Sequence, residues 1–416
     1  MAKAPSVYRS KNFVKLWVSQ VVSKAGANFV EVGLAVFAMS VAHGDLAAYG
    51  GIIFAGMIPA VLLGWAVGGV ADRWDRKRTM VSGDIIRALL VLSVPVVNQL
   101  WWAYGAVFLV ETVGLVYKPG VRAMTPDTVG EGQVMAAGSA LSVGQSIVDI
   151  PVYLLVGVIV ARAGSASPFL IDATAFVVAG ATLATLALPA QVAAGRARAT
   201  SFWSDLRDGV AFHLQTPVVG RLLVLSMVGV IGVAGVNVAS AAVIQHLLGR
   251  PEGDLGWLLA GIAAGMWVGS SLMGRLGDDH RRYSVFIALG LLGFGLETAG
   301  VAWSRDLFVT IGLYLVGGFC NAVYQLPIRA WLQTTVPREM RGRVFAARGM
   351  GIGSTAAVAA LLTGWVVNLW TLPVTLVVLA AFAVAAAGLA VFWLARAARA
   401  ASGGVAAAPA PSRIGG

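Results

Sequence analysis

Twelve apolar segments constrain this chain more than any other feature of its sequence, because each is long enough to cross a lipid bilayer. A spanning helix needs about 20 mostly apolar residues, and a helix satisfies its own backbone hydrogen bonds in lipid. The segments are residues 12–41, 48–71, 80–98, 100–118, 134–162 and 168–189, then 218–248, 255–276, 283–303, 306–327, 343–370 and 372–396. The sequence therefore predicts an all-α polytopic membrane protein with twelve transmembrane helices.

The composition agrees with a membrane protein and argues against a metal site. Hydrophobic residues make up 58% of the 416 residues and charged residues 12%, whereas soluble domains carry about 25% charged residues. The first span contains Lys15, Lys24 and Glu31 and ends without a small-residue cleavage site, so we expect it to be retained rather than removed as a signal peptide. The single cysteine, Cys320, excludes a multi-cysteine metal site, and the four histidines show no ligand spacing. We expect no metal and no cofactor.

Basic residues gather in alternate connections between the segments. A net charge of +11 suits nucleic acid in a soluble protein, but in so apolar a chain it follows from the excess of Lys and Arg in cytoplasmic loops. With the N-terminus inside, the outer side receives only Arg162, Arg250 and Arg305. We therefore expect no nucleic-acid partner. We also expect an even number of spans in a bacterial inner membrane, with both termini on the cytoplasmic side.

The two halves of the chain repeat each other in the same orientation. Residues 117–123 align with 324–330, and residues 68–72 align with 274–278 at nearly the same shift. The alternative is a chance similarity between basic loops. The repeat predicts four parts, namely an N-terminal six-helix half at 1–189, a cytoplasmic linker at 190–216, a C-terminal six-helix half at 217–396 and a disordered tail at 397–416.

The connection at residues 68–78 packs four cations and two carboxylates between two spans. It resembles the signature loop between helices 2 and 3 of the major facilitator superfamily, with Val70 and Asp75 as departures. The matching residues are Gly68, Ala71, Asp72, Arg73, Arg76 and Lys77. The following Asp84-x-x-Arg87 and the run at 337–344 resemble the drug and siderophore exporter branch, which includes macrolide efflux proteins and enterobactin exporters. The alternative is a basic turn of any polytopic protein.

The resemblance implies the major facilitator fold, in which two parallel-related halves rock to expose a central site to each side in turn. We interpret one charged set as a conformational latch on the cytoplasmic side, and the alternative is charge that only sets the topology. The set is Gly68, Asp72, Arg73, Arg76, Asp84, Arg87 and Arg122.

Charged residues inside the spans are the candidates for transport, because each costs about 2.5–3.5 kcal/mol on insertion scales. The candidates for transport or proton coupling are Lys24, Glu31, Glu111, Asp149 and Glu297. Lys24 and Glu31 lie seven positions apart on nearly one helix face, and the alternative for them is a local structural pair. Asp172 lies near the outer end of its span, and we expect water to hydrate it.

Large or polar side chains within the spans are candidates to line a cavity for a bulky amphiphilic substrate. They are Asn28, Phe29, Tyr153, Trp267 and Tyr324. Most aromatic residues in spans serve packing or the membrane interface, so each of them has that alternative role.

The sequence predicts a secondary transporter, namely a proton-coupled exporter of lipophilic drugs or secondary metabolites. One alternative is a proton-coupled uptake permease for a small metabolite, because the loops do not encode direction. Another is a membrane-embedded enzyme or sensor, but the sequence contains no Walker, His-Glu-x-x-His or Gly-x-Ser-x-Gly motif. We expect no enzymatic activity, a small-molecule substrate and the lipid bilayer as partners, the proton gradient as energy source, and a monomer.

Overall fold

The computed structural model describes residues 7–71, 75–129, 133–187, 202–274, 280–337 and 339–403, and these ranges contain helices and no strand. The first half comprises α1 (Lys11–Val41), α2 (Leu46–Ala71), α3 (Arg76–Val97), α4 (Leu100–Thr128), α5 (Val134–Ala163) and α6 (Ser167–Ala184). The second comprises α8 (Pro217–Ala242), α9 (Leu255–Met273), α10 (His280–Trp303), α11 (Leu307–Thr335), α12 (Arg341–Leu369) and α13 (Leu372–Gly403). Within the described ranges, 12 helices are long and apolar enough to cross a membrane, as predicted.

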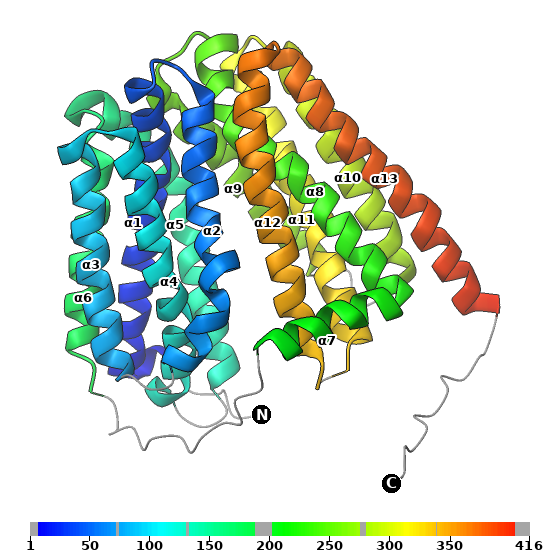
Figure 1. Ribbon diagram of the computed structural model, residues 1–416, viewed down its shortest axis with the longest axis horizontal. Coiled ribbons are helices and arrows are strands. Elements are labelled where there is room, and N and C mark those ends of the chain that lie inside the picture. The colour runs from blue at the N-terminus through cyan, green and yellow to red at the C-terminus, as the bar shows by residue number, and fades with distance from the viewer. Residues whose placement is uncertain are drawn as a thin grey trace.

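The helices alternate in direction, so the molecule has two ends (Figure 1). We call the end where α1 begins and α13 finishes the terminal end, which lies at the bottom of Figure 1. The opposite end, where α1 finishes and α2 begins, is the distal end. The two halves stand side by side, close together near the distal end and diverging toward the terminal end.

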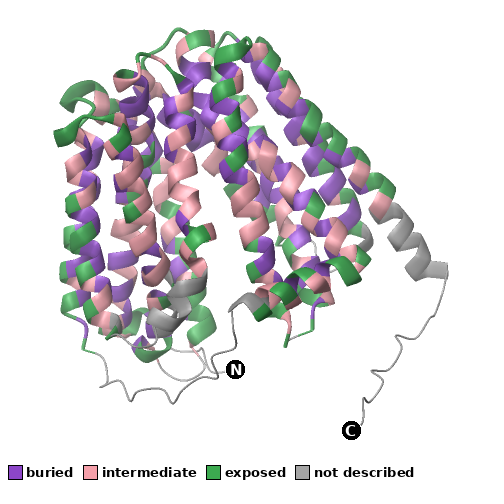
Figure 2. Ribbon diagram, in the orientation of Figure 1, coloured by how far each residue is buried: buried purple, intermediate pink, exposed green. Residues whose placement is uncertain are grey.

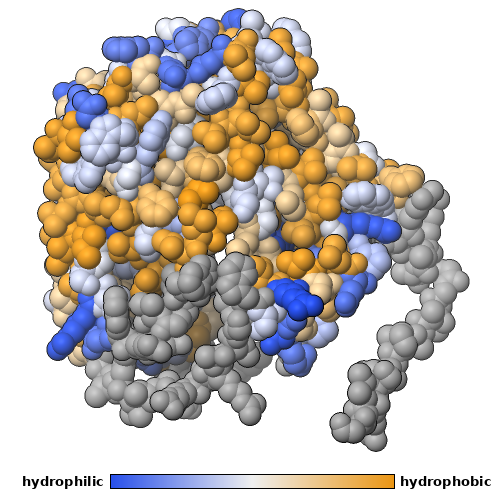
Figure 3. Space-filling model, viewed as in Figure 1, coloured by the Kyte–Doolittle hydropathy of each residue, from blue (hydrophilic) through white to orange (hydrophobic). Residues whose placement is uncertain are grey.

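The outer faces of the helices carry the apolar side chains that a bilayer requires. Figure 2 shows exposed residues along the length of α13, and those side chains include Val374, Phe382 and Val391. Figure 3 shows hydrophobic residues covering the sides of the helices, with the most hydrophilic ones near the upper and lower edges. Exposed apolar surface of this extent is stable only when lipid covers it.

α4 and α11 extend beyond the ends that the sequence predicted. The predicted ends, 118 and 327, lie at prolines, whereas the helices continue past Pro119 and Pro327 to Thr128 and Thr335. A proline inside a helix removes one backbone hydrogen bond, a loss that packing on neighbouring helices can offset. Both helices have 29 residues and begin and end at aligned positions of the internal repeat, so the structure confirms that repeat.

The connection between the halves contains a helix that the sequence analysis did not predict. α7 (Phe202–Gln215) is too short to span, and it packs against the start of α12. Asp208 of α7 forms an ion pair with Arg343, with 2.9 Å between Oδ2 and Nη1. α13 also continues past residue 396 to Gly403, because its Ala- and Arg-rich sequence favours helix. Residues 188–201 and 404–416 lie outside the described part.

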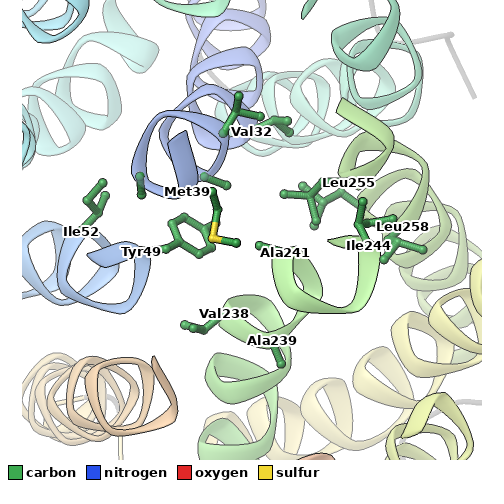
Figure 4. Packing of buried hydrophobic residues seen from close by; sticks show 14 of the residues in the cluster. Val32, Met39, Tyr49, Ile52, Val238, Ala239, Ala241, Ile244, Leu255 and Leu258 are labelled. Atoms are coloured by element: carbon green, nitrogen blue, oxygen red, sulfur yellow. The ribbon is translucent and has the colours of Figure 1, made fainter. Parts of the chain in front are cut away.

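One apolar core joins the two halves near the distal end. Figure 4 shows side chains of α1 and α2 facing those of α8, the following π-helical turn η2 (Val243–Leu247) and α9. The labelled members are Val32, Met39, Tyr49, Ile52, Val238, Ala239, Ala241, Ile244, Leu255 and Leu258. Toward the terminal end, by contrast, three buried apolar clusters each belong to one half only. The buried core therefore holds the halves together at the distal end.

Direct helix contact reinforces that joint. A Cβ on Gly364 of α12 would lie only 2.7 Å from the backbone oxygen of Leu46 at the start of α2, so α12 can approach this closely only with glycine there. Beside it, Asn368 Nδ2 donates a hydrogen bond of 2.5 Å to Asp45 Oδ1. On the other flank, a Cβ on Gly256 of α9 would overlap the backbone oxygen of Tyr153 of α5. Both contacts close the distal end.

Replacing Gly256 with alanine should separate α5 from α9 at the distal end, because the added methyl group has no room beside the Tyr153 oxygen. Spin labels at Arg162 and Trp257, in a Cys320→Ala background, would report the separation by pulsed electron paramagnetic resonance. We expect a longer and broader distance distribution for Gly256→Ala.

Gly312→Ala in α11 is the matched control, because a Cβ there would meet nothing within 4 Å. It should leave the distribution unchanged. A Gly256→Ala distribution identical to that of the control would contradict closure through this contact.

Candidate functional site

A cavity of about 1030 Å³ lies between the helices of the first half, and its wall comes mainly from α1, α2, α4 and α5. It extends from Tyr49 and Ile52, at the level of the joint core, to Val134, the first residue of α5. Asn237 of α8 contributes from the second half. Because the distal end is closed by packing, the cavity is reached from the terminal end.

A polar network links α1 to α5 at the wall of the cavity. Lys24 Nζ donates a hydrogen bond of 2.7 Å to Asn28 Oδ1 and lies 3.3 Å from Asp149 Oδ1. Asn28 Nδ2 donates to the same Asp149 oxygen at 2.7 Å. Three of the predicted residues therefore meet. Lys24 pairs across helices and not locally with Glu31, because seven positions separate side chains by about 10 Å along a helix.

Glu31 faces the cavity and has a partner of its own. It is exposed, and Tyr153 Oη donates a hydrogen bond of 2.6 Å to its Oε2. Tyr153 was predicted to line the cavity, but it is 9% exposed and does not form part of the wall. It contacts the wall residue Glu31 through its hydroxyl group. The carboxylate of Glu31 is thus open to the cavity and has a hydrogen-bond donor. Glu111 of α4 also lies in the cavity wall, as part of the same predicted set.

Arg87 lies inside the first half and forms part of the cavity wall. Its guanidinium carbon is 4.7 Å from the centre of the Tyr117 ring and 5.3 Å from that of Phe176, so two aromatic faces hold the cation. Arg87 Nε donates a hydrogen bond of 3.4 Å to the backbone oxygen of Val110. The sequence analysis had assigned Arg87 to a latch at the membrane surface. The structure places it about three turns inside α3, which begins at Arg76.

Asp84 lies one turn before Arg87 and is completely buried. Tyr117 Oη, at 3.4 Å, donates to its Oδ2, and Gln20 Nε2 donates to the same hydroxyl group at 3.0 Å. The other oxygen of Asp84, Oδ1, has no hydrogen-bond donor. Asp84 and Arg87 therefore belong to the interior of the first half, because α3 packs them against α4 and α6.

The other residues of the predicted latch stay a prediction. Asp72 and Arg73 lie outside the described residues, and so do the side chains of Arg76 and Arg122. Gly68 lies near the end of α2, in the part whose side-chain surroundings are not described.

Asp172 of α6 is a functional candidate that the sequence analysis did not select. We expected water to hydrate it, and this was wrong, because it is 1% exposed and α1 covers it. Its Oδ1 has no hydrogen-bond donor, yet the residue forms part of the cavity wall. The sequence did contain a signal of burial. Phe176 and Gly180 follow Asp172 at intervals of four residues, so the helix face that carries this lone carboxylate is otherwise apolar.

The second half contains one of the predicted carboxylates, Glu297 of α10. It is 3% exposed and accepts a hydrogen bond of 3.1 Å from Thr298 Oγ1. A separate cavity of about 30 Å³ lies against it, and Asn237 forms part of the wall of both cavities. Glu297 therefore lies beside the large cavity without facing it.

Three predicted cavity residues lie elsewhere. Phe29 and Tyr324 are buried in apolar clusters, and Trp267 is 63% exposed on the surface of α9. A helix turns by about 100° per residue, so a span read without its neighbours does not reveal which face meets the cavity. Among the residues that the structure describes, no group of three His, Cys, Asp or Glu side chains is arranged to hold a metal ion.

Replacing Arg87 with methionine should destabilise the protein by about 3–5 kcal/mol, because Asp84 would be left buried without the cation beside it. The free energy of unfolding in mixed micelles titrated with sodium dodecyl sulfate measures the effect. Arg162→Met, at the exposed end of α5, is the matched control and should change stability by less than about 0.5 kcal/mol.

Combining Arg87→Met with Asp84→Asn should restore part of the loss, because one buried carboxylate is removed together with the cation. If the Arg87→Met single variant is as stable as the control, Arg87 does not stabilise the buried carboxylate of Asp84.

The known proteins that this chain resembles are membrane transporters, in agreement with the twelve candidate spans. Residues 222–414 match the family model of the Major Facilitator Superfamily. The chain is 26% identical over 351 residues to the uncharacterised MFS-type transporter YfiS of Bacillus subtilis (strain 168), covering 82% of this chain and 84% of that protein. It is 22% identical over 343 residues to macrolide efflux protein A of Streptococcus pyogenes, covering 81% and 84%. The crystal structure of the nucleoside transporter NupG aligns with a TM-score of 0.76, 14% identity and coverage of 92% and 99%, a likeness of fold alone.

Proposed function

We propose that this chain, which belongs to the major facilitator superfamily, is a proton-coupled exporter of lipophilic drugs or secondary metabolites. Its relatives are transporters and not enzymes, so the site must bind a substrate on one side of the membrane and release it on the other. The observation that carries the proposal is the cavity of about 1030 Å³, closed at the distal end and lined by both apolar and charged side chains.

We assign the terminal end to the cytoplasm. Cytoplasmic connections carry the excess of Lys and Arg in membrane proteins. The distal end holds Arg162, Arg250 and Arg305, whereas most of the other Lys and Arg residues that the structure describes lie toward the terminal end. With this orientation the cavity faces the cytoplasm, and the conformation is the inward-open state of an alternating-access cycle.

The size and chemistry of the wall suit a bulky amphiphile. Drug-sized ligands occupy pockets of about 300–1,000 Å³ that are mostly apolar, with a few polar groups that fix orientation. Here Ile53, Met57 and Val107 supply apolar surface, and Glu31 and Glu111 supply charge. Efflux of macrolides is the activity in the name of one relative, and macrolides are substrates of this kind.

The charge balance of the cavity supports a cation as the coupling ion. Among the described side chains in or beside the wall, the cations are Lys24 and Arg87, and the carboxylates are Glu31, Asp84, Glu111, Asp149 and Asp172. Carboxylates in excess bind protons when water is scarce. The proton gradient then supplies the energy, with Glu31, Glu111, Asp149 and Glu297 as candidates for carrying the proton.

Export is tested in efflux-deficient bacteria that express the chain and are exposed to macrolides, dyes and siderophores. We expect lower intracellular accumulation of at least one compound, and we expect a protonophore to abolish the difference. Glu31→Gln should weaken the effect because it removes a charge from the wall. Trp267→Phe, on the exposed surface of α9, is the matched control and should behave as wild type.

Two outcomes would contradict this proposal. Raised accumulation that depends on the proton gradient would establish uptake in place of export. Unchanged accumulation across the whole panel, with the protein present in the membrane, would show that the substrate class is wrong.

A further inference from the structure

Among the described residues, Asp172 is the carboxylate of the cavity wall that has a buried oxygen without a hydrogen-bond donor; Asp84 has another such oxygen but lies outside the wall. Glu31 is exposed and accepts from Tyr153, and Asp149 pairs with Lys24 and accepts from Asn28. Asp172 is 1% exposed, and an ionised carboxylate without hydrogen bonds in such a place costs several kcal/mol.

The charged groups around Asp172 leave Arg87 as its cation. α6 packs against α1, α3 and α5, whose charged residues near the cavity are Lys24, Glu31, Asp84, Arg87 and Asp149, and Glu111 faces the same cavity from α4. Lys24 is engaged by Asn28 and Asp149. Arg87 lies between two aromatic rings and donates to Val110. Arg87 follows Asp84 by one turn of α3, and the Phe176 ring that it contacts follows Asp172 by one turn of α6, so one guanidinium group stands near both buried carboxyl groups.

The packing keeps a space for the carboxyl group itself. A Cβ on Gly26 of α1 would lie 2.5 Å from Asp172 Oδ1 and 2.7 Å from the Ala175 Cβ. Glycine at this position lets α1 cover the carboxyl group without displacing it. Asp172 and Arg87 both form part of the cavity wall, so the carboxyl group lies within reach of a proton that enters from the cavity once the side chains there move.

We propose that Asp172 is a proton-binding site, occupied in this conformation and emptied when Arg87 turns to pair with it. The inference rests on the proposed function and names the group that carries the proton. On release, the O–H bond of the carboxyl group breaks, the proton passes to water, and the guanidinium group of Arg87 neutralises the carboxylate that remains. Asp84 is the less suitable carrier, because it accepts from Tyr117 and does not form part of the cavity wall.

Infrared difference spectroscopy on the purified full chain in lipid nanodiscs tests proton binding directly. We expect a carbonyl stretch from a protonated carboxyl group in an apolar site, reduced in Asp172→Asn and unchanged in Glu31→Gln. Asparagine has the shape of the protonated acid, so the variant should fold, and its thermal unfolding checks this. Glu297→Gln identifies the contribution to the band from Glu297, which is also buried.

A carbonyl band of the same intensity in Asp172→Asn, or no such band in the wild type, would overturn the proposal. So would a loss of the band in Asp84→Asn alone.

Transport in proteoliposomes separates this inference from the proposed function, with erythromycin as probe. We expect Asp172→Asn to lose transport driven by a proton gradient while keeping the exchange of labelled for unlabelled probe. Unchanged gradient-driven transport in Asp172→Asn would refute the role of this residue. A wild type without gradient-driven transport would instead refute the proposed function, and the infrared result would then decide the proton site alone.

Discussion

Close packing between the two halves at the distal end is the constraint on which the rest of the structure depends. Gly364 and Gly256 bring the helices of one half against the backbone of the other, and a shared apolar core fills the space between them. Because one end is held by packing, the halves can separate only at the other. The cavity follows that geometry, since it extends from the level of the joint core to the start of α5. The joint relies on shape more than on charge, so it can be broken and remade reversibly.

The two halves divide the physical tasks unequally, although the chain repeats itself. The charged groups of the cavity come from the first half, where Lys24 with Asp149 and Tyr153 with Glu31 satisfy one another across helices. The second half contributes Asn237 to that wall and keeps Glu297 in a cavity of its own. An apolar bundle tolerates charges only where such partners exist. Among the described residues, Asp84 and Asp172 each have a buried oxygen without a hydrogen-bond donor. A change of conformation that moves a donor or a cation toward them therefore alters their stability most.

The sequence predicts the spans well because the bilayer imposes their length and composition. It fails where tertiary packing decides. The prolines of α4 and α11 suggested helix ends that neighbouring helices override, and α7 lacks the apolar length that marks a span. Charge in a span correctly directed attention to Glu31 and Lys24. Asp172 and Trp267 were misjudged because position along a span does not reveal which helix covers a side chain. α1 covers Asp172, whereas Trp267 is 63% exposed within the described part of the chain.

In the proposed orientation, the cavity opens to the cytoplasm and is closed on the other side. The most direct test places a cysteine at Ser142, an exposed position in the cavity wall, in a Cys320→Ala background. A membrane-impermeant thiol reagent is then applied to inside-out and right-side-out vesicles. We expect rapid labelling in inside-out vesicles and slow labelling in right-side-out ones. Equal rates from both sides, or faster labelling from the outside, would contradict it.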